Sequence, residues 1–348
     1  MVPLTDRILC LNPGSSAFRY AVYESDGETE IDRRHVDGLD AGDLESHRHA
    51  LESVLDSMDS LSLAGIGYRV VHGGDLYSAR TIIDDTVVEG LRSLAHLAPQ
   101  HLPIAIGTIE IVRQRSPNLH HVARFDTAFH HGLPDVAKRF PLPESLWSQG
   151  IRRYGFHGLS FEYVVRSLGE RLPKRTVIAH LGNGSSMVAL LDGVSVDTTM
   201  GMTPAGGLMM GSRSGDLDPG VVVHLLREMQ LSPDALDDLV NKEAGLKGVS
   251  GLTSDMRTLL TKRGESPSAD LAIRMYCYHV RKHIGAMSAV LGGLDLLVFT
   301  GGVGENAKEV RDEILRGLEY LHCDTEVVRT NESQMMARHV RDAITHTA

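Results

Sequence analysis

A short glycine–serine turn between two apolar segments occurs twice in the chain, and this repeat constrains the fold more than any other feature. The first copy is Gly14-Ser15-Ser16, and the second, Gly184-Ser185-Ser186, lies 170 residues later. Each copy follows an apolar segment short enough for a buried strand and precedes a second such segment, so each predicts a β-hairpin. Two matching hairpins half a chain apart predict a duplicated α/β domain.

Turns of this composition suit the binding of phosphate. Glycine lets backbone N–H groups approach an anion closely, and serine hydroxyls would add further donors. For one isolated turn, an ordinary hairpin without a ligand is the commoner explanation. Because the turn is repeated, we expect the two domains to present their loops to a polyphosphate in an interdomain cleft.

Composition limits the classes of function. The 348 residues suffice for two domains, and the formal net charge of −10 argues against nucleic acid and anionic membrane as partners. No apolar stretch approaches the roughly 20 residues that cross a bilayer, and the first residues do not resemble a secretory signal. Cys10, Cys277 and Cys323 are scattered, which favours reduced thiols in a cytoplasmic protein. The 18 histidines show no zinc-ligand spacing.

Three charged residues stand where an α/β protein places its chemistry. Arg69 interrupts an apolar strand predicted over residues 66–74, where it must find an anion; a structural ion pair is the alternative. Asp126 follows the apolar part of a second strand, a position typical of active sites, although a lone Asp more often caps a turn. Arg213 lies in a glycine-rich segment that would let its guanidinium reach a phosphate.

Periodicity predicts the remaining elements. We expect helices over residues 41–58, 84–97, 104–113, 161–172, 221–229, 233–242, 269–291, 307–318 and 332–344, an N-capped helix start at 251–257, and a strand at 294–300 before a glycine turn. The predicted domains are residues 1–145 and 146–331, and the helix within 332–348 is expected to complete the first domain.

With these residues in view, the chain resembles the acetate kinase family over nearly its whole length. The matching segments are Asn12–Ser16, Arg69–Gly74, Phe125–His130, Tyr154–Gly158, His180–Ser186, Gly211–Gly215, Gly301–Asn306 and Thr330–Glu332. One segment would be a weak signal, whereas all of them in the family's order are highly specific. The resemblance implies the duplicated actin/hexokinase-like (ribonuclease H-like) two-domain fold and a homodimer. It also implies Mg²⁺- or Mn²⁺-dependent, direct in-line transfer of the ATP γ-phosphoryl group to acetate or another short-chain carboxylate, reversibly, giving ADP and an acyl phosphate.

The resemblance also implies roles for individual residues. Around the reacting groups it places Asn12, Arg69, Asp126, His157 and Arg213, with Asp126 orienting the carboxylate. It assigns the metal to Asn12 and Glu332, and the acid to Arg69, Val71, Phe156 and Pro204. It assigns the nucleotide to Arg19, His180, Leu181, Gly182, Asn183, Gly184, Asp255, Met256, Arg257, Gly301, Gly302, Val303, Gly304 and Asn306.

Some positions depart from the family pattern. Ala17 stands where the family usually has a third serine, Arg19 where it has lysine, and Gln100 where leucine is more frequent. The chain is also shorter than usual between Leu318 and Thr330. These departures bear on the phosphoryl donor and the preferred acid rather than on the reaction class.

Two alternatives from other functional classes stay open on the sequence. Residues 302–307 fit the G-x-G-x-x-A pattern of dinucleotide oxidoreductases, but only 44 residues follow Gly304, too few for the rest of such a domain. A non-catalytic nucleotide-binding regulator on the same scaffold would not need Arg69, His157, Arg213 and Glu332 together. A P-loop enzyme is excluded in its usual form, because the sequence contains no G-x-x-x-x-G-K-[ST] motif.

Overall fold

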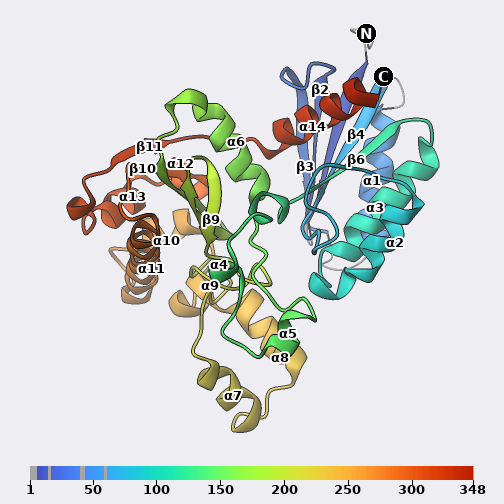
Figure 1. Cartoon of the computed structure of the whole chain (residues 1–348). Helices are drawn as coiled ribbons and strands as arrows, with labels where there is room; N and C mark the ends of the chain where they lie inside the picture. The colour runs from blue at the N-terminus through green and yellow to red at the C-terminus, as the bar shows by residue number, and fades with distance from the viewer. Residues whose placement is uncertain (1–5, 15–16, 40–43, 59–60, 348) are drawn as a thin grey trace. The chain divides into compact units, whose positions relative to one another are not determined.

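The computed structural model describes residues 6–14, 17–39, 44–58 and 61–347 (Figure 1). The chain forms two compact units. Unit 1 contains Met1–His131, Gly158–Tyr163 and Asn331–Ala348, and unit 2 contains Gly132–His157 and Val164–Thr330. Ser15 and Ser16 of the first glycine–serine turn lie outside the described residues. The domain boundary at residues 145 and 146 stays a prediction.

Unit 1 contains a mixed sheet that has six strands in the described part of the chain, in the order β3-β2-β1-β4-β6-β5. Their bounds are β1 Arg7–Pro13, β2 Ala17–Glu24, β3 Glu30–Asp37, β4 Leu63–Val70, β5 Thr81–Ile82 and β6 His120–Phe125. The predicted hairpin is present, because β1 pairs antiparallel with β2. Strand β4 runs parallel to both β1 and β6.

Helices cover both faces of this sheet. They are α1 (Leu44–Met58), α2 (Asp85–Ser93), α3 (Leu102–Arg115) and α14 (Glu332–Thr347), with short 3₁₀ turns at Ala95–Leu97 and Ala128–His130. Ile8 and Cys10 of β1 pack in one cluster with Met336 of α14. Leu9 and Leu11 point to the opposite face, since side chains alternate along a strand. Helix α3, which contacts β1 and β4, covers that face.

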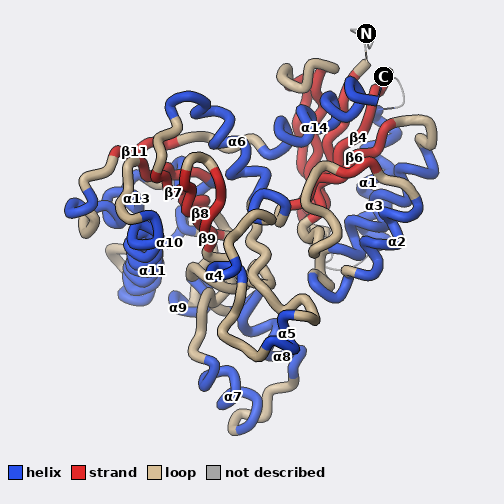
Figure 2. Tube along the Cα trace, viewed as in Figure 1, coloured by secondary structure: helices blue, strands red, loops and turns tan. Residues whose placement is uncertain are grey.

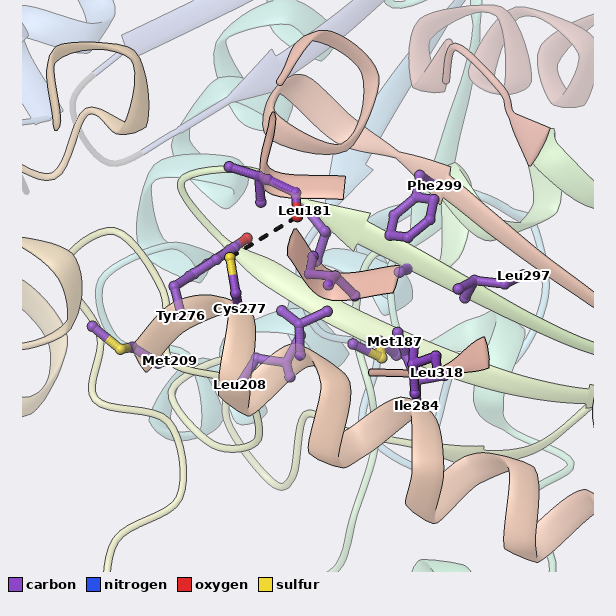
Figure 3. Packing of buried hydrophobic residues seen from close by; sticks show 14 of the residues in the cluster. Leu181, Met187, Leu208, Met209, Tyr276, Cys277, Ile284, Leu297, Phe299 and Leu318 are labelled. Carbon is purple, nitrogen blue, oxygen red and sulfur yellow. Dashed lines mark hydrogen bonds between the residues drawn. The ribbon is translucent and has the colours of Figure 1, made fainter. Parts of the chain in front are cut away.

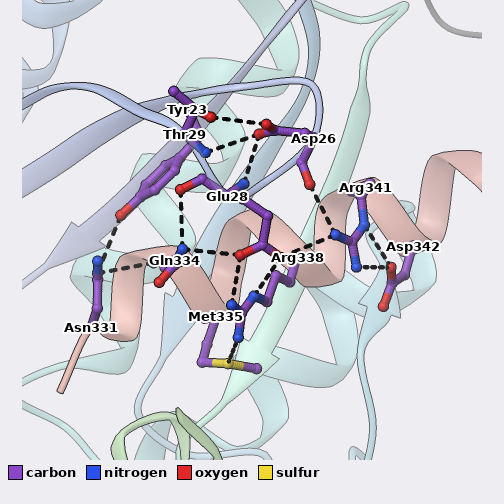
Figure 4. Close-up of polar contacts among 10 residues, drawn as sticks. All are labelled: Tyr23, Asp26, Glu28, Thr29, Asn331, Gln334, Met335, Arg338, Arg341 and Asp342. Atoms are coloured by element: carbon purple, nitrogen blue, oxygen red, sulfur yellow. Dashed lines mark hydrogen bonds and ion pairs between the residues drawn. The ribbon is translucent and has the colours of Figure 1, made fainter. Parts of the chain in front are cut away.

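Two glycines in β4 allow α14 to approach the sheet closely. A Cβ atom on Gly65 would lie 2.8 Å from Cγ1 of Val340, and one on Gly67 would lie 3.0 Å from its Cγ2. Polar contacts fix the exposed side of the helix, as Figure 4 shows: Glu28, in the turn between β2 and β3, accepts hydrogen bonds from Arg338 at 2.8 and 2.6 Å. The first residue of α14, Glu332, is thereby held at one end of the sheet.

Unit 2 contains a second mixed sheet, with five strands among the described residues, in the order β11-β10-β7-β8-β9. The strands are β7 Arg175–Leu181, β8 Ser185–Leu191, β9 Val194–Thr198, β10 Leu296–Thr300 and β11 Asp324–Val327. The helices are α4 Asp135–Lys138, α5 Glu144–Trp147, α7 Pro219–Arg227, α8 Pro233–Asp238, α9 Gly245–Ser250, α10 Met256–Lys262, α11 Pro267–Leu291, α12 Gly301–Asn306 and α13 Lys308–Leu315. Helix α6 (Gly158–Leu168) begins in unit 1 and ends in unit 2. Figure 2 shows how much of this unit is loop.

The core of unit 2 lies between its sheet and α11. Leu181, Met187 and Phe299 from the strands pack in one cluster with Tyr276 and Ile284 of α11 (Figure 3). All five side chains are at most 1% exposed. One face of α11 therefore carries a long stripe of buried side chains, which packs against β7 and β8 and against α9 and α10.

The two sheets share one topology. In unit 1 the order β3-β2-β1-β4-β6 begins with antiparallel pairs and continues with parallel ones. In unit 2 the order β9-β8-β7-β10-β11 does the same. The prediction of a duplicated α/β domain is therefore confirmed.

Most elements predicted from the sequence are present, with local differences. The helix expected over 233–242 is α8, which ends at Asp238 and continues as a π-helical segment, Leu239–Glu243. Gly301–Asn306, expected as a turn, is the short helix α12. In the described residues no helix combines the length and the apolarity needed to cross a membrane.

Candidate functional site

Three polar residues of unit 1 stand at the ends of neighbouring parallel strands. Asn12 is near the end of β1, Arg69 is near the end of β4, and Asp126 directly follows β6. Because β1, β4 and β6 are parallel neighbours, their carboxyl ends lie at the same edge of the sheet. The fold thus brings together residues that the sequence separates by more than fifty positions.

Arg69 is the centre of this polar group. Its Nε and Nη2 atoms donate to the two carboxylate oxygens of Asp126 at 3.0 and 2.5 Å, a bidentate pair. Its Nη1 atom donates to Oδ1 of Asn12 at 3.0 Å. Oε2 of Glu332, from the start of α14, lies 3.8 Å from Nε. Three residues that the sequence resemblance relates to the reaction therefore surround the guanidinium of a fourth, Arg69.

The electrostatics of the group follow from burial and from the two carboxylates. The side chain of Asp126 is 1% exposed, and those of Arg69 and Glu332 are each 19% exposed. Burial alone would lower the pKa of Arg69, but Asp126 and Glu332 outweigh it and raise that pKa above its ordinary value. One positive and two negative charges leave this group with an excess of negative charge, which a divalent cation would neutralise.

The oxygen donors near Arg69 fit Mg²⁺. Among the described residues, no cluster of three or more His, Cys, Asp or Glu could hold a metal ion. Mg²⁺ usually keeps several waters and binds through one or two carboxylates and the substrate's phosphates, so it needs no such cluster. The carboxylate of Glu332 and the carboxamide oxygen of Asn12 are hard donors of the type that Mg²⁺ prefers.

Two histidines form the corresponding group in unit 2. His157 precedes α6 in a left-handed conformation, with φ 59° and ψ 24°. Its ring stacks on that of His180 near the end of β7, with centroids 4.2 Å apart and planes at 20°. Its Nδ1 atom lies 2.8 Å from Oγ of Ser186 in β8. The hairpin β7–β8 therefore fixes the orientation of the His157 ring.

Arg213 joins these histidines beside the turn that connects β7 to β8. Nη1 of Arg213 and Nε2 of His157 each lie 3.4 Å from the point that a Cβ atom on Gly184 would occupy. Nη1 of Arg213 also donates to the carbonyl of Pro204 at 3.3 Å. Two side-chain nitrogens thus approach the same glycine, an arrangement that can hold an anionic oxygen.

The glycine-rich β7–β8 turn and the glycine-rich start of helix α12 lie side by side. A Cβ atom on Gly301 would be 2.7 Å from the carbonyl oxygen of Leu181, and one on Gly182 would be 3.9 Å from the amide nitrogen of Gly302. Gly301 has a φ of 77°, which favours glycine there. Asn183 is held by the next loop, because its carbonyl accepts from the Gly211 amide at 3.0 Å. The structure therefore brings the predicted nucleotide residues of β7, the β7–β8 turn and α12 together.

Side-chain hydrogen bonds stabilise both ends of helix α12. Asn306 donates from Nδ2 to the Gly302 carbonyl at 2.9 Å. Oε1 of Glu305 accepts from the amides of Gly301 at 3.0 Å and Thr330 at 3.1 Å. Val303 and Gly304 lie within this short helix, with Gly304 buried. Glu305 thus ties the start of α12 to the residues that lead to α14.

The other predicted site residues have clear structural positions. Asp255 caps α10, because its carboxylate accepts from the amides of Arg257 at 3.4 Å and Thr258 at 3.1 Å. Met256 packs in the hydrophobic core of unit 2. Arg19 is exposed on β2, opposite Asn12 in the sheet register. Val71 and Phe156 are buried, and Pro204 is half-buried.

The serines of the second glycine–serine turn are not exposed to a ligand, contrary to the sequence interpretation. Ser185 and Ser186 belong to β8 and are 0% exposed. The Ser185 hydroxyl lies 2.9 Å from the hydroxyl of Tyr276, and the Ser186 hydroxyl contacts His157. We did not predict from the sequence that these hydroxyls are buried and contact other side chains. The uninterrupted apolar run after them could have indicated that the strand already starts at Ser185.

The sequence and the fold are similar to those of known proteins. The sequence model of the acetokinase family matches residues 7–345. The chain belongs to the acetokinase family. It is 40% identical to an acetate kinase of Rhodopseudomonas palustris (strain TIE-1), over 91% of this chain and 87% of the relative. It is 41% identical to an acetate kinase of Clostridium botulinum (strain 657 / Type Ba4), over 90% of this chain and 88% of the relative.

Solved structures agree with this membership of the acetokinase family. The acetate kinase of Porphyromonas gingivalis matches with a TM-score of 0.88 at 31% identity, covering 99% of this chain and all of its own. A propionate kinase of Francisella tularensis also matches with a TM-score of 0.88 at 31% identity, covering 96% and 98%. The duplicated actin/hexokinase-like fold is thereby confirmed, and the dinucleotide-oxidoreductase alternative is set aside. A ROK family transcriptional regulator, at 10% identity and a TM-score of 0.52, shares the fold alone.

Proposed function

We propose that this protein transfers the γ-phosphoryl group of ATP reversibly to acetate or another short-chain carboxylate, giving ADP and an acyl phosphate. Membership of the acetokinase family supports this reaction, and the similar proteins include both acetate kinases and a propionate kinase. The observation that carries the proposal is the group in which Asn12, Asp126 and Glu332 surround Arg69. A regulator without catalysis would not need this group.

The chemistry requires positioning more than proton transfer. A carboxylate oxygen of the acid forms a bond to the γ-phosphorus while the bond from that phosphorus to the bridging oxygen of ADP breaks. A short carboxylic acid, with a pKa of about 4 to 5, is already ionised at neutral pH and needs no base. Both oxygens of Asp126 accept hydrogen bonds from Arg69. We infer that Asp126 orients this arginine instead of removing a proton.

Hydrogen-bond donors of arginine and histidine side chains would stabilise the charge that develops during transfer. Negative charge spreads over the equatorial oxygens of the phosphoryl group in the transition state, so fixed donors around it accelerate transfer. We propose that Arg69 in unit 1 and His157 and Arg213 in unit 2 supply these donors. Arg69 would also bind the acid, whose alkyl group we assign to Val71, Phe156 and Pro204 on the family resemblance. The β7–β8 turn and the start of α12 would bind the phosphates, and Asp255–Arg257 the adenosine.

We propose Mg²⁺ as the metal, with Asn12 and Glu332 as the residues that hold it through water. When bound, this ion would neutralise charge on the phosphates and on the carboxylates of Asp126 and Glu332. Mn²⁺ has the same preference for oxygen donors and would serve in its place. The excess negative charge around Arg69 supports a cation at this position.

The resemblance also leads us to propose a homodimer that works in the cytoplasm. The cysteines are free thiols, with Cys10 and Cys277 buried, as expected in a reducing compartment. Analytical ultracentrifugation of the purified protein would measure the oligomeric state directly.

A hydroxamate assay tests the proposed reaction. Purified protein, MgATP and hydroxylamine are incubated with acetate, propionate or butyrate, and the trapped acyl phosphate is measured as hydroxamate together with ADP. We expect equal amounts of both products, abolished by excess EDTA. Pyrophosphate in place of ATP tests the donor, and the three acids rank the preference. ADP release without hydroxamate would contradict the proposal.

A further inference from the structure

The hydroxyl of Ser186 points at His157 and not at solvent. Ser186 is the second residue of β8 and is 0% exposed. Its Oγ atom lies 2.8 Å from Nδ1 of His157. The neighbouring Ser185 is equally buried but contacts Tyr276 and the Gly182 carbonyl. The two serines therefore hold different partners, and only Ser186 acts on the histidine.

The direction of this hydrogen bond follows from counting hydrogens. A neutral imidazole carries one proton, on either Nδ1 or Nε2. If Nδ1 carried it and donated to Ser186, the buried serine O–H would need another acceptor, and the contacts of the described residues give it only His157. A buried donor without an acceptor is strongly disfavoured. If the serine donates to Nδ1 instead, both groups are satisfied and Nε2 carries the proton.

The other ring nitrogen of His157, Nε2, faces the space beside Gly184, where an N–H could donate to an anionic oxygen. Nε2 of His157 and Nη1 of Arg213 each approach Gly184, 3.4 Å from where its Cβ atom would be. An Nε2 that carries hydrogen donates to an anionic oxygen there, whereas its lone pair would repel that oxygen. The stacked ring of His180, 4.2 Å away, restricts rotation of the His157 ring.

We propose that Ser186 is a positioning residue that sets the tautomer of His157. Its hydroxyl donates to Nδ1, so that neutral His157 presents an N–H from Nε2 beside Arg213 to an oxygen of the transferred phosphoryl group. The second serine of the turn thereby acts on phosphate through the histidine, without touching the ligand. The role of the Nε2 proton in transfer rests on the proposed function; the tautomer itself does not.

Nitrogen-15 NMR of the imidazole side chains of the full chain, without ligands, reads the tautomer directly. The signals of His157 are identified by their loss in His157→Asn, since asparagine tolerates the left-handed backbone at this position. In the native protein we expect a protonated Nε2 and an unprotonated Nδ1. In Ser186→Ala we expect a mixture of tautomers, because the fixed donor to Nδ1 is gone.

Kinetics of the same variants separate positioning from general damage. We expect Ser186→Ala to lower kcat about tenfold, the effect of losing one ordinary hydrogen bond, with KM for ATP and acetate nearly unchanged. Ser185→Ala is the matched control, because it removes a neighbouring buried hydroxyl without touching His157. It should lower stability but leave the His157 spectrum as in the native protein.

Two results would overturn the inference: a native His157 protonated on Nδ1, or a Ser186→Ala protein with unchanged tautomer and kcat. A native protein that shows the expected tautomer but forms no acyl phosphate would overturn the proposed function alone. A native protein that forms acyl phosphate while Ser186→Ala changes nothing would overturn the inference alone.

Discussion

Arg69 shows how one buried cation can organise several acidic and polar groups. It sits in an apolar strand, where an isolated charge would be costly, and the structure compensates it with a bidentate carboxylate. Asp126 in turn is almost fully buried and would be equally costly without the arginine. Each charge thus stabilises the other in its buried position. The guanidinium also donates from Nη1 to Asn12, and its Nε atom lies near the carboxylate of Glu332.

Removing the carboxylate should therefore destabilise the protein before any ligand is added. For Asp126→Ala we expect a loss of about 3 kcal/mol in the free energy of unfolding, because Arg69 loses its bidentate partner and keeps only the more distant carboxylate of Glu332. Urea unfolding without ligands measures it. Asp56→Ala is the control, since Asp56 pairs with Arg115 but is 70% exposed, and should change stability by less than about 0.5 kcal/mol. Equal effects of the two substitutions would show that Asp126 does not hold Arg69.

Arg213 should act on the transition state more than on the ground state. We expect Arg213→Ala to lower kcat about 10²- to 10³-fold, the size seen when one preorganised donor is removed, with a much smaller rise in KM. Steady-state kinetics with ATP and acetate provide both constants. Arg227→Ala, at the exposed end of α7, is the control and should match the native protein. An unchanged kcat in Arg213→Ala would make this arginine structural.

The sequence indicates these residues better than it indicates their partners. Arg69 is conspicuous because charge is rare in an apolar strand, and Asp126 because of its place at a strand end. Their bidentate contact depends on the register of β4 against β6, which no local pattern contains. The serines mislead for the opposite reason: Gly184-Ser185 looks like a loop locally, yet β8 starts within it.

At the scale of elements, α14 and the start of α6 are fixed to the sheet of unit 1 by an acidic residue whose side chain is 12% exposed. Glu162 of α6 accepts a hydrogen bond from Arg124 of β6 at 2.8 Å and lies 3.0 Å from Nε2 of His339 in α14. Burial alone would raise the pKa of Glu162, but the hydrogen bond with His339 and the charge of Arg124 outweigh it and lower that pKa to about 2. This residue connects three elements of the unit.

The pKa of Glu162 predicts a loss of stability in acid. The folded-state pKa is below the ordinary value of 4.5, so the ionised residue stabilises the fold above that pH, and the contribution is lost as pH falls toward about 2. Its upper limit is about 3 kcal/mol. Urea unfolding from pH 6 to pH 3 should show a steeper decline for the native protein than for Glu162→Gln, whose amide does not titrate. Parallel declines would contradict the assignment.

Elements that pack through apolar stripes could be predicted, whereas polar edge elements could not. The long helix α11 and an N-capped helix start within residues 251–257 are predicted from the sequence and confirmed in the structure, where Asp255 is the capping residue of α10. Strands β3 and β11 lie at sheet edges and carry charged side chains, so they lack the alternation that marks a strand. The close approach of α14 to β4 could not be predicted from the sequence either, although Gly65 and Gly67 make it possible.

At the scale of the whole molecule, the two units are copies of one domain, and each copy carries a different group of polar residues. The same strand order and the same initial hairpin occur in both sheets, as the repeated glycine–serine turn predicts. The polar residues of the two copies differ. Unit 1 carries the acidic group around Arg69, and unit 2 carries the histidines, Arg213 and the glycine turns. We propose that the residues around Arg69 and those around His157 and Arg213 take part in the same reaction.

The most direct test is phosphorus-31 NMR of the reverse reaction, with acetyl phosphate, ADP and Mg²⁺, in the native protein and in Arg69→Ala and Arg213→Ala. Each variant removes the principal cation of one unit, and circular dichroism verifies that both are folded. The account predicts that the native protein transfers the phosphoryl group of acetyl phosphate to ADP and forms ATP. In either variant we expect a rate at least about 100-fold lower. The absence of ATP with the native protein, or a native rate in either variant, would contradict the account.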